Sequence, residues 1–509
     1  MAKLFSIRSV LIGTVVAVGA AAGWWLYQNR DVSPSEYHET GSMGPVQQWP
    51  LIPIHAIILP DGRVMSYGTH ADGKQGGEFH YDIWTPSMGL ADKASHLTLP
   101  NKTGTDIFCS GQVIVPSDDS VLLVGGDRTV NGVRNYSSAD INFFDYKKNE
   151  MTPATGQRTM QYPRWYPTVV TMPNGDILVS GGRLDMEHYV SDIELYSPGK
   201  GWKTLNGAKS AAAFGEPNWI YPMSWVTPAG KVFILSITGE TFMVDTAGEG
   251  HIETTSLRVP SGIFYLPAVM YSPGKILTLR AWGRAGIVDI NGAQPTYTPT
   301  SRHGLGGRIN AFATVLPDGK VFLSGGGVRV INRLNKDFLV NYATALWDPK
   351  TGQWTHGPRT GRMRLYHSIS LLLPDATVLV AGGGAPGPQT NTNAEIYYPP
   401  YLYKQDGSGT LVDKRPQILE APTFMSWGKD IQVKTDGADV SRVTLVHAGS
   451  VTHTMNFDQR MFDLSFKSDG ASLNVTPPGS ANVAPPGYYM LFVFDKAGVP
   501  STAKLIKLG

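Results

Sequence analysis

Three reactive side chains stand at the same distance from a proline in separate parts of the chain. Cys109, Tyr166 and His367 each come seven residues before a proline, at positions 116, 173 and 374. A thiol, a phenol and an imidazole can act as nucleophiles, proton carriers or metal ligands. Cys109 is the only cysteine, so it forms no disulfide within the chain. A lone cysteine is most often a small buried hydrophobic residue, but the shared spacing favours a common site.

The three prolines belong to an internal repeat. Each copy has a Pro-containing turn and an apolar run, often closed by two glycines, and the turn prolines are 44 to 57 residues apart. Four copies are clear and three are weaker: LPDGRVMSYG (59–68), MPNGDILVSGG (172–182), LPDGKVFLSGGG (316–327), LPDATVLVAGGG (373–384), then VPSDDSVLLVGG (115–126), TPAGKVFILS (227–236) and SPGKILTL (272–279).

This repeat predicts a seven-bladed, kelch-type β-propeller. Pro followed by Asp-Gly or Asn-Gly joins two antiparallel strands, and a repeat of this length holds about four strands, which is one blade. The alternative is a set of unrelated hairpins in a β-sandwich protein. The strand before each turn is typically innermost in a propeller, so residues in one register lie at one height around the axis. Tyr221 and Asn310 share the register of Cys109 and are expected near the pocket.

The rest of the composition agrees with an all-β fold. The chain has 57 Gly and 36 Pro, a formal net charge of +2 and only 17% charged residues, so nothing indicates nucleic-acid binding. We expect the propeller to span residues 31–403. Beyond IYYPPYLY (396–403) the glycine pairs stop and short alternating runs such as RVTLVHAG begin, which predicts an immunoglobulin-like β-sandwich at 404–509.

The N-terminus predicts a membrane segment within residues 1–30. Val10–Tyr27 carries no charge, follows Lys3 and Arg8, and ends in aromatic residues typical of a membrane interface. We interpret it as a signal-anchor, with a cleaved signal peptide and a buried core helix as the alternatives. Under the first two, the remainder works outside the cytoplasm, in the periplasm or the extracellular space, where paired cysteines usually form disulfides.

Five stretches together resemble motifs of the copper-radical oxidases, the galactose oxidase and glyoxal oxidase family. The resemblance runs from about residue 50 to the C-terminus, in the family's order, and rests on TDIFCSG, PRWYP, RLYHSISLLLPD, AGSVTHTMNFDQR and PPGYYMLFVFDKAGVPS. It implies one copper ion and a self-processed radical cofactor, a thioether between the Cys109 sulfur and the Tyr166 ring.

The resemblance also implies a role for each residue of the site. Tyr166 would bind copper and carry the radical, Tyr366 would be the axial ligand and catalytic base, and His367 and His453 would be the nitrogen ligands. Imidazole nitrogens and phenolate oxygens suit Cu(II). Because Tyr366 and His367 are consecutive, both reach one metal only at a strand end, a bulge or a twisted loop.

The implied reaction is oxidation of a small aldehyde or primary alcohol by O₂, which leaves as H₂O₂. The chain has no room for the sugar-binding domain that precedes the propeller of galactose oxidase, so it looks more like the glyoxal oxidases. Leu184 stands where galactose oxidase stacks a tryptophan on the cross-linked tyrosine, with His188 and Tyr189 nearby, in a loop that reads as ordinary surface.

Two other functions remain open at this stage. One is a membrane-tethered kelch propeller that binds a protein or glycan and keeps a vestigial copper site; the presence of all five side chains argues against it. The other is a propeller hydrolase such as a sialidase, whose arginine cluster and Tyr/Glu pair the sequence does not supply. The natural substrate, the oligomeric state and any partner that consumes H₂O₂ or builds a polymer are not predicted.

Overall fold

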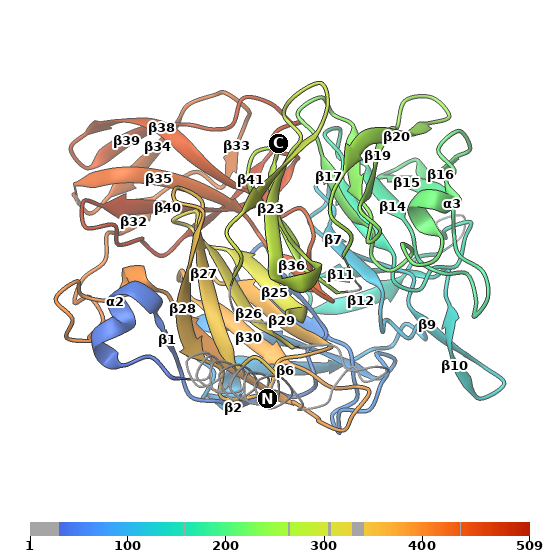
Figure 1. Cartoon of the computed structure of the whole chain (residues 1–509), viewed down its shortest axis with the longest axis horizontal. Coiled ribbons are helices and arrows are strands. Elements are labelled where there is room, and N and C mark those ends of the chain that lie inside the picture. The colour runs from blue at the N-terminus through green and yellow to red at the C-terminus, as the bar shows by residue number, and fades with distance from the viewer. Residues whose placement is uncertain (1–29, 156–158, 263–264, 304–306, 328–339, 438) are drawn as a thin grey trace, which may run out of the picture.

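A computed structural model describes residues 30–155, 159–262, 265–303, 307–327, 340–437 and 439–509. Its strands form seven blades of a propeller and a C-terminal sheet (Figure 1). The first six blades each have four antiparallel strands: β3 (His55–Ile58), β4 (Val64–Tyr67), β5 (His80–Trp84), β6 (His96–Pro100); β7 (Gly111–Ile114), β8 (Val121–Val124), β11 (Ile141–Asp145), β12 (Glu150–Pro153); β13 (Thr168–Thr171), β14 (Ile177–Ser180), β15 (Ile193–Ser197), β16 (Gly201–Leu205); β17 (Met223–Val226), β18 (Val232–Leu235), β19 (Glu240–Asp245), β20 (His251–Arg258); β21 (Ala268–Ser272), β22 (Lys275–Arg280), β23 (Arg284–Asp289), β24 (Thr296–Thr300); β25 (Ile309–Val315), β26 (Val321–Gly327), β27 (Ala343–Asp348), β28 (Gln353–Arg359).

The seventh blade closes the ring. It consists of β29 (Ser368–Leu372), β30 (Val378–Gly382) and β31 (Asn393–Tyr398), and its outer edge is completed by β1 (Ser42–Met43) and β2 (Gln47–Gln48) from the beginning of the chain. Pairing early residues with the last blade leaves no open seam between the first and seventh blades. The predicted all-β fold with seven blades is confirmed.

The first strand of each blade is innermost, as the repeat predicts. First strands of neighbouring blades contact one another, as β7 does with β13 and β25 with β29. These strands are buried along their length, since both faces pack against adjacent blades. A hairpin of β9 (Asp127–Val130) and β10 (Val133–Ser137) extends from the second blade.

The C-terminal strands form a sandwich-like sheet beside the propeller (orange to red in Figure 1). Strand β38 pairs with β35 through its first half and with β39 through its second, so one long strand serves both parts of the sheet. The strands are β32 (Ile418–Glu420), β33 (Phe424–Met425), β34 (Ile431–Thr435), β35 (Val440–His447), β38 (Met461–Asp469), β39 (Ser472–Thr476), β40 (Gly487–Asp495) and β41 (Lys504–Leu508).

Helices are few and short in the described residues. The longest are α2 (Tyr37–Thr40) and α3 (Ala211–Phe214), beside the 3₁₀ turns η1 (Pro34–Glu36), η2 (Pro86–Met88), η3 (Lys93–Ser95), η4 (Ala281–Gly283) and η5 (Pro400–Leu402). None of the helices described has the length and apolar character needed to cross a bilayer. The predicted anchor, Val10–Tyr27, lies outside the described residues and stays a prediction.

Candidate metal centre

Close to the start of six inner strands stands a residue in the left-handed backbone region, and we call these six the lead-in residues. Their φ angles run from 38° to 67°, which is uncommon for residues other than glycine. The lead-in residues are Cys109, Tyr166, Tyr221, Tyr265, Asn310 and His367. The kink turns the chain from the axis into the blade. It is also the irregularity that was expected at Tyr366 and His367. Both residues precede β29, so the rule that consecutive strand residues point to opposite faces does not apply to them.

Backbone hydrogen bonds fix the lead-in residues relative to one another. The amide of Tyr166 donates to the carbonyl of Cys109 at 3.0 Å, and the amide of Tyr221 donates to that of Tyr166 at 3.0 Å. The amide of Asn310 likewise donates to the carbonyl of Tyr265 at 2.8 Å. Neighbouring blades are therefore joined at one height around the axis, as the shared spacing of Tyr221 and Asn310 predicted.

Buried arginines fasten two of these segments to the glycine pairs. Arg364 donates to Glu395 at 2.7 Å and to the Gly382 carbonyl at 2.9 Å, with both charged side chains fully buried. Arg164 makes the same contacts with Glu194 and Gly181 in the third blade. These arginines stand two residues before Tyr366 and Tyr166. Each arginine and its buried partners therefore form a clamp that positions a tyrosine of the site.

The glycine pairs allow neighbouring blades to approach closely. A Cβ on Gly125 would overlap the carbonyl oxygen of Arg164, and one on Gly325 would overlap that of Arg364. Both glycines have left-handed φ angles, 69° and 66°. The glycine punctuation of the repeat thus leaves room for the segment that carries the next blade's tyrosine.

A hairpin of the C-terminal sheet enters the centre of the propeller. Strand β36 (Ser450–Thr452) pairs with β3 of the first blade and with β37 (Met455–Asn456). Its two-residue turn is His453-Thr454, with φ angles of 43° and 70°, the signature of a type I′ turn. The segment after the turn bonds to other inner strands: Asp458 accepts from the Thr171 amide at 2.9 Å. The predicted reach of His453 into the channel is therefore observed.

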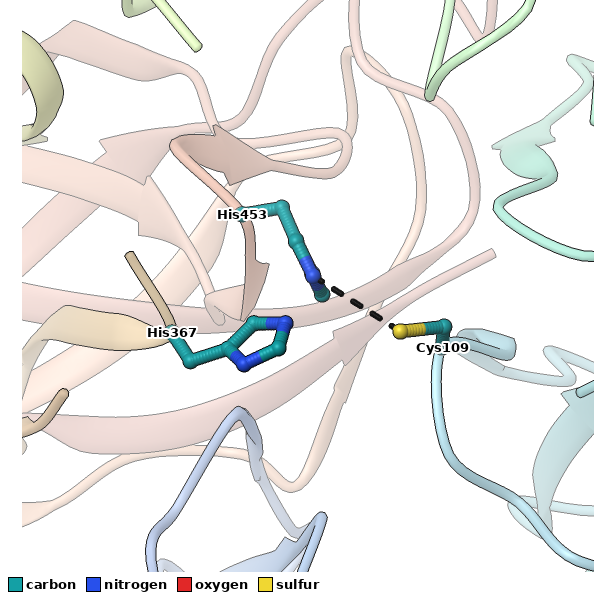
Figure 2. Close-up of side chains that lie close together, drawn as sticks. All are labelled: Cys109, His367 and His453. Carbon is teal, nitrogen blue, oxygen red and sulfur yellow. Dashed lines mark hydrogen bonds between the residues drawn. The ribbon is translucent and has the colours of Figure 1, made fainter. Parts of the chain in front are cut away.

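The five predicted side chains meet in one buried volume. Each is at most 5% exposed. The Tyr166 and Tyr366 hydroxyls are 2.5 Å apart, and the ring centroids of His367 and His453 are 4.5 Å apart. The Cys109 sulfur lies 3.7 Å from His453 Nε2. Figure 2 shows Cys109, His367 and His453 converging from three separate segments.

Both imidazoles present Nε2 to this volume. The Nδ1 of His367 hydrogen-bonds the Gly384 carbonyl at 2.9 Å, and that of His453 bonds the Thr452 hydroxyl at 2.6 Å. Among the residues that the structure describes, buried His367 Nε2 has no hydrogen-bond partner. Burial lowers the pKa of His367 to about 3; burial, together with the charges of His367 and His55, holds the pKa of His453 well below its usual value. Both rings are thus neutral, the form that binds metal ions.

The donor set fits copper. An orphaned imidazole nitrogen, a second imidazole and two phenols gather in one place, and the ligand atoms of Cys109, His367 and His453 lie within 4.8 Å of one another. Burial is the main cause that raises the pKa values of Tyr166 and Tyr366 well above 10, so these phenols need a nearby cation in order to ionise. Nitrogen and phenolate oxygen ligands of this kind suit Cu(II).

Sequence reasoning missed three aromatic residues around Tyr166 and Tyr366. The Tyr265 hydroxyl donates to that of Tyr366 at 3.3 Å, and the ring centroids of Trp165 and Trp219 lie 4.3 and 5.7 Å from that of Tyr166. Tyr265 stands eight residues before Pro273, not seven, because it lies three residues before its inner strand β21, whereas Tyr166 lies two residues before β13. The signal that was available is the recurrence of a proline just after the lead-in tyrosines.

The loop expected to supply a tryptophan does not cover Tyr166. Leu184 is 36% exposed, and His188 is exposed and bonded to Asp185. The surface interpretation of His188 therefore holds. Tyr189 is different, because it is partly buried and its ring lies 5.6 Å from that of Trp219.

Comparison with known proteins gives consistent matches. Residues 415–508 match the family model described as Galactose oxidase-like, Early set domain. Galactose oxidase of Gibberella zeae is 29% identical over 92% of this chain and 70% of the relative. The aldehyde oxidase GLOX of Vitis pseudoreticulata is 27% identical over 82% of this chain and 85% of its own length. A solved fungal alcohol oxidase in complex with copper superposes with a TM-score of 0.81, at 26% identity, over 92% of this chain and all of its own.

Proposed function

Because the chain belongs to the copper-radical oxidase family, we propose that it oxidises a small aldehyde or primary alcohol with O₂ and releases H₂O₂, in the manner of the glyoxal oxidases. The observation that carries the proposal is the convergence of Cys109, Tyr166, Tyr366, His367 and His453 in one buried site. These are the side chains that the family's chemistry requires.

The proposed ligands are Tyr166, Tyr366, His367 and His453. Copper held by them would bind the substrate oxygen and accept one electron. Tyr366 Oη takes the hydroxyl proton of the alcohol or hydrated aldehyde, and the Tyr166 radical takes a hydrogen atom from the carbon. Its hydroxyl lies 2.5 Å from that of Tyr366, so the proton and the hydrogen atom are accepted at adjacent oxygens.

The remaining residues hold these groups and exclude water. A thioether would join the Cys109 sulfur to the Tyr166 ring, with oxidation by O₂ removing two hydrogens. Thr452 and the Gly384 carbonyl fix the ring orientations of the histidines. Tyr265 is partly exposed and bonded to Tyr366, which places it beside the substrate's path to the base.

A small substrate is supported by the loop at Leu184. This loop offers an exposed aliphatic side chain where galactose oxidase has its tryptophan. We also propose that the catalytic part works outside the cytoplasm, which the apolar segment at Val10–Tyr27 supports. Whether that segment stays as an anchor or is cleaved, the exported part is the same.

Peroxide release tests the function. Copper-loaded protein is assayed in air with small aldehydes, primary alcohols and sugars; we expect H₂O₂ with at least one aldehyde or small alcohol. Tyr366→Phe keeps the ring and removes the base, so it should abolish release. Tyr146→Phe, on an outer strand turn, is the matched control and should keep it. No peroxide from the wild type with any substrate would favour the binding-module alternative.

A further inference from the structure

A column of aromatic side chains leads from Tyr166 to the protein surface. The ring centroid of Trp219 lies 5.7 Å from that of Tyr166, and the centroid of Tyr189 lies 5.6 Å from that of Trp219. Trp219 is 7% exposed, whereas Tyr189 is partly exposed in the loop between β14 and β15. Indole and phenol rings are side chains that can lose and regain a single electron, so contact between them allows an electron to move in single steps.

The outer end of the column carries its own proton acceptor. The indole N–H of Trp219 donates to Glu216 Oε2 at 2.8 Å. A hydrogen bond to the same carboxylate, and then burial, raise the pKa of Tyr189. A phenol that loses an electron must also lose its proton, and the exposed carboxylate of Glu216 is placed to take it.

Trp165 touches Tyr166 more closely but lacks these features. Its ring centroid is 4.3 Å from that of Tyr166, yet its buried indole N–H has no partner within the described part of the chain. The Arg183 guanidinium lies 4.2 Å from its ring and 5.4 Å from that of Trp219. A cation over an indole face opposes removal of an electron, and only Trp219 has a carboxylate to offset it.

We propose that Tyr166, Trp219 and Tyr189 form a one-electron relay between the buried radical site and the surface, with Glu216 as its proton acceptor. This rests on the proposed function, since it needs a radical at Tyr166. The Tyr166 radical takes an electron from Trp219, which recovers one from Tyr189 as the Tyr189 proton moves to Glu216. A soluble one-electron donor then reduces the Tyr189 radical and the proton returns. The net change is one electron from the donor to Tyr166.

The test follows the radical rather than turnover. Copper-loaded full-length protein in the radical form is mixed with ferrocyanide, a soluble one-electron donor, and the visible absorption of the radical is followed by stopped flow. We expect Trp219→Phe, Tyr189→Phe and Glu216→Gln each to slow its decay about tenfold or more, which corresponds to ~1.4 kcal/mol on the barrier. Tyr162→Phe changes another partly exposed tyrosine and should decay like the wild type.

The outcomes separate the relay from its premise. If the wild type forms neither thioether nor radical, the proposed function fails and the relay with it. If the radical forms but Tyr189→Phe and Glu216→Gln decay at the wild-type rate, the relay alone is refuted. Slower decay of the radical in Trp219→Phe alone would also refute the relay. It would mean that Trp219 acts only by packing against Tyr166.

Discussion

The propeller and the C-terminal sheet supply the candidate metal centre in different ways. The blades bring Cys109, Tyr166 and His367 together by repetition, since each is the lead-in residue of its own blade. The C-terminal sheet sends in His453 on one hairpin that has no counterpart elsewhere in the described chain. In the blades, the repeat itself fixes where each residue lies along the propeller axis. The hairpin has to be held in place by specific bonds to the inner strands, such as that between Asp458 and the Thr171 amide.

Removing the hairpin's contribution should have the largest effect on metal binding. His453→Ala deletes a proposed ligand, so we expect copper affinity to fall by more than the roughly 100-fold that loss of an outer partner costs. Copper competition with a chelator measures it. His447→Gln alters another buried histidine of the same sheet and is the control. Unchanged affinity in His453→Ala would mean that the blades hold copper alone.

Breaking the buried ion pair of Arg364 and Glu395 should reduce the stability of the fold. Glu395→Gln leaves the buried charge of Arg364 without its partner, so the free energy of unfolding should fall by about 3–5 kcal/mol. Urea unfolding of the metal-free protein measures this. The exposed pair of Glu420 and Lys434 provides the control: Glu420→Gln should change it by less than about 1 kcal/mol. Equal effects would show that the clamp does not hold the lead-in segment.

A smaller loss of copper affinity is expected when the hairpin residue that orients His453 is changed. Thr452→Val removes the hydroxyl bonded to His453 Nδ1, so the ring loses the partner that fixes its orientation. Copper affinity should fall about 10–100-fold while Thr452→Ser retains it. Isothermal titration with a copper chelate distinguishes the two variants. If Thr452→Val binds as the wild type does, the packing of the hairpin alone orients His453.

The same contrast explains what the sequence predicts and what it does not. Seven Pro-containing turns, four of them followed by a glycine pair, reveal the blades and the common height of Tyr166 and His367, because the repeat is local and regular. Tyr265 escaped because one more residue separates it from the start of its inner strand. Trp219 escaped because its approach to Tyr166 depends on how two neighbouring blades pack. The place of His453 in the channel followed only from the family resemblance, since no local pattern reports where a hairpin inserts.

The most direct test of the account is the bond between Cys109 and Tyr166. Copper-free protein is exposed to copper in air, and its intact mass, thiol reactivity and peptide map are measured. The account predicts a loss of two hydrogen atoms, disappearance of the thiol, and one cross-linked peptide that contains Cys109 and Tyr166. Tyr166→Phe should prevent all three changes. Cys109→Ser, which has no thiol, should keep its full mass and give no cross-linked peptide. A wild-type protein that keeps its full mass and a free thiol after copper and O₂ would contradict the account.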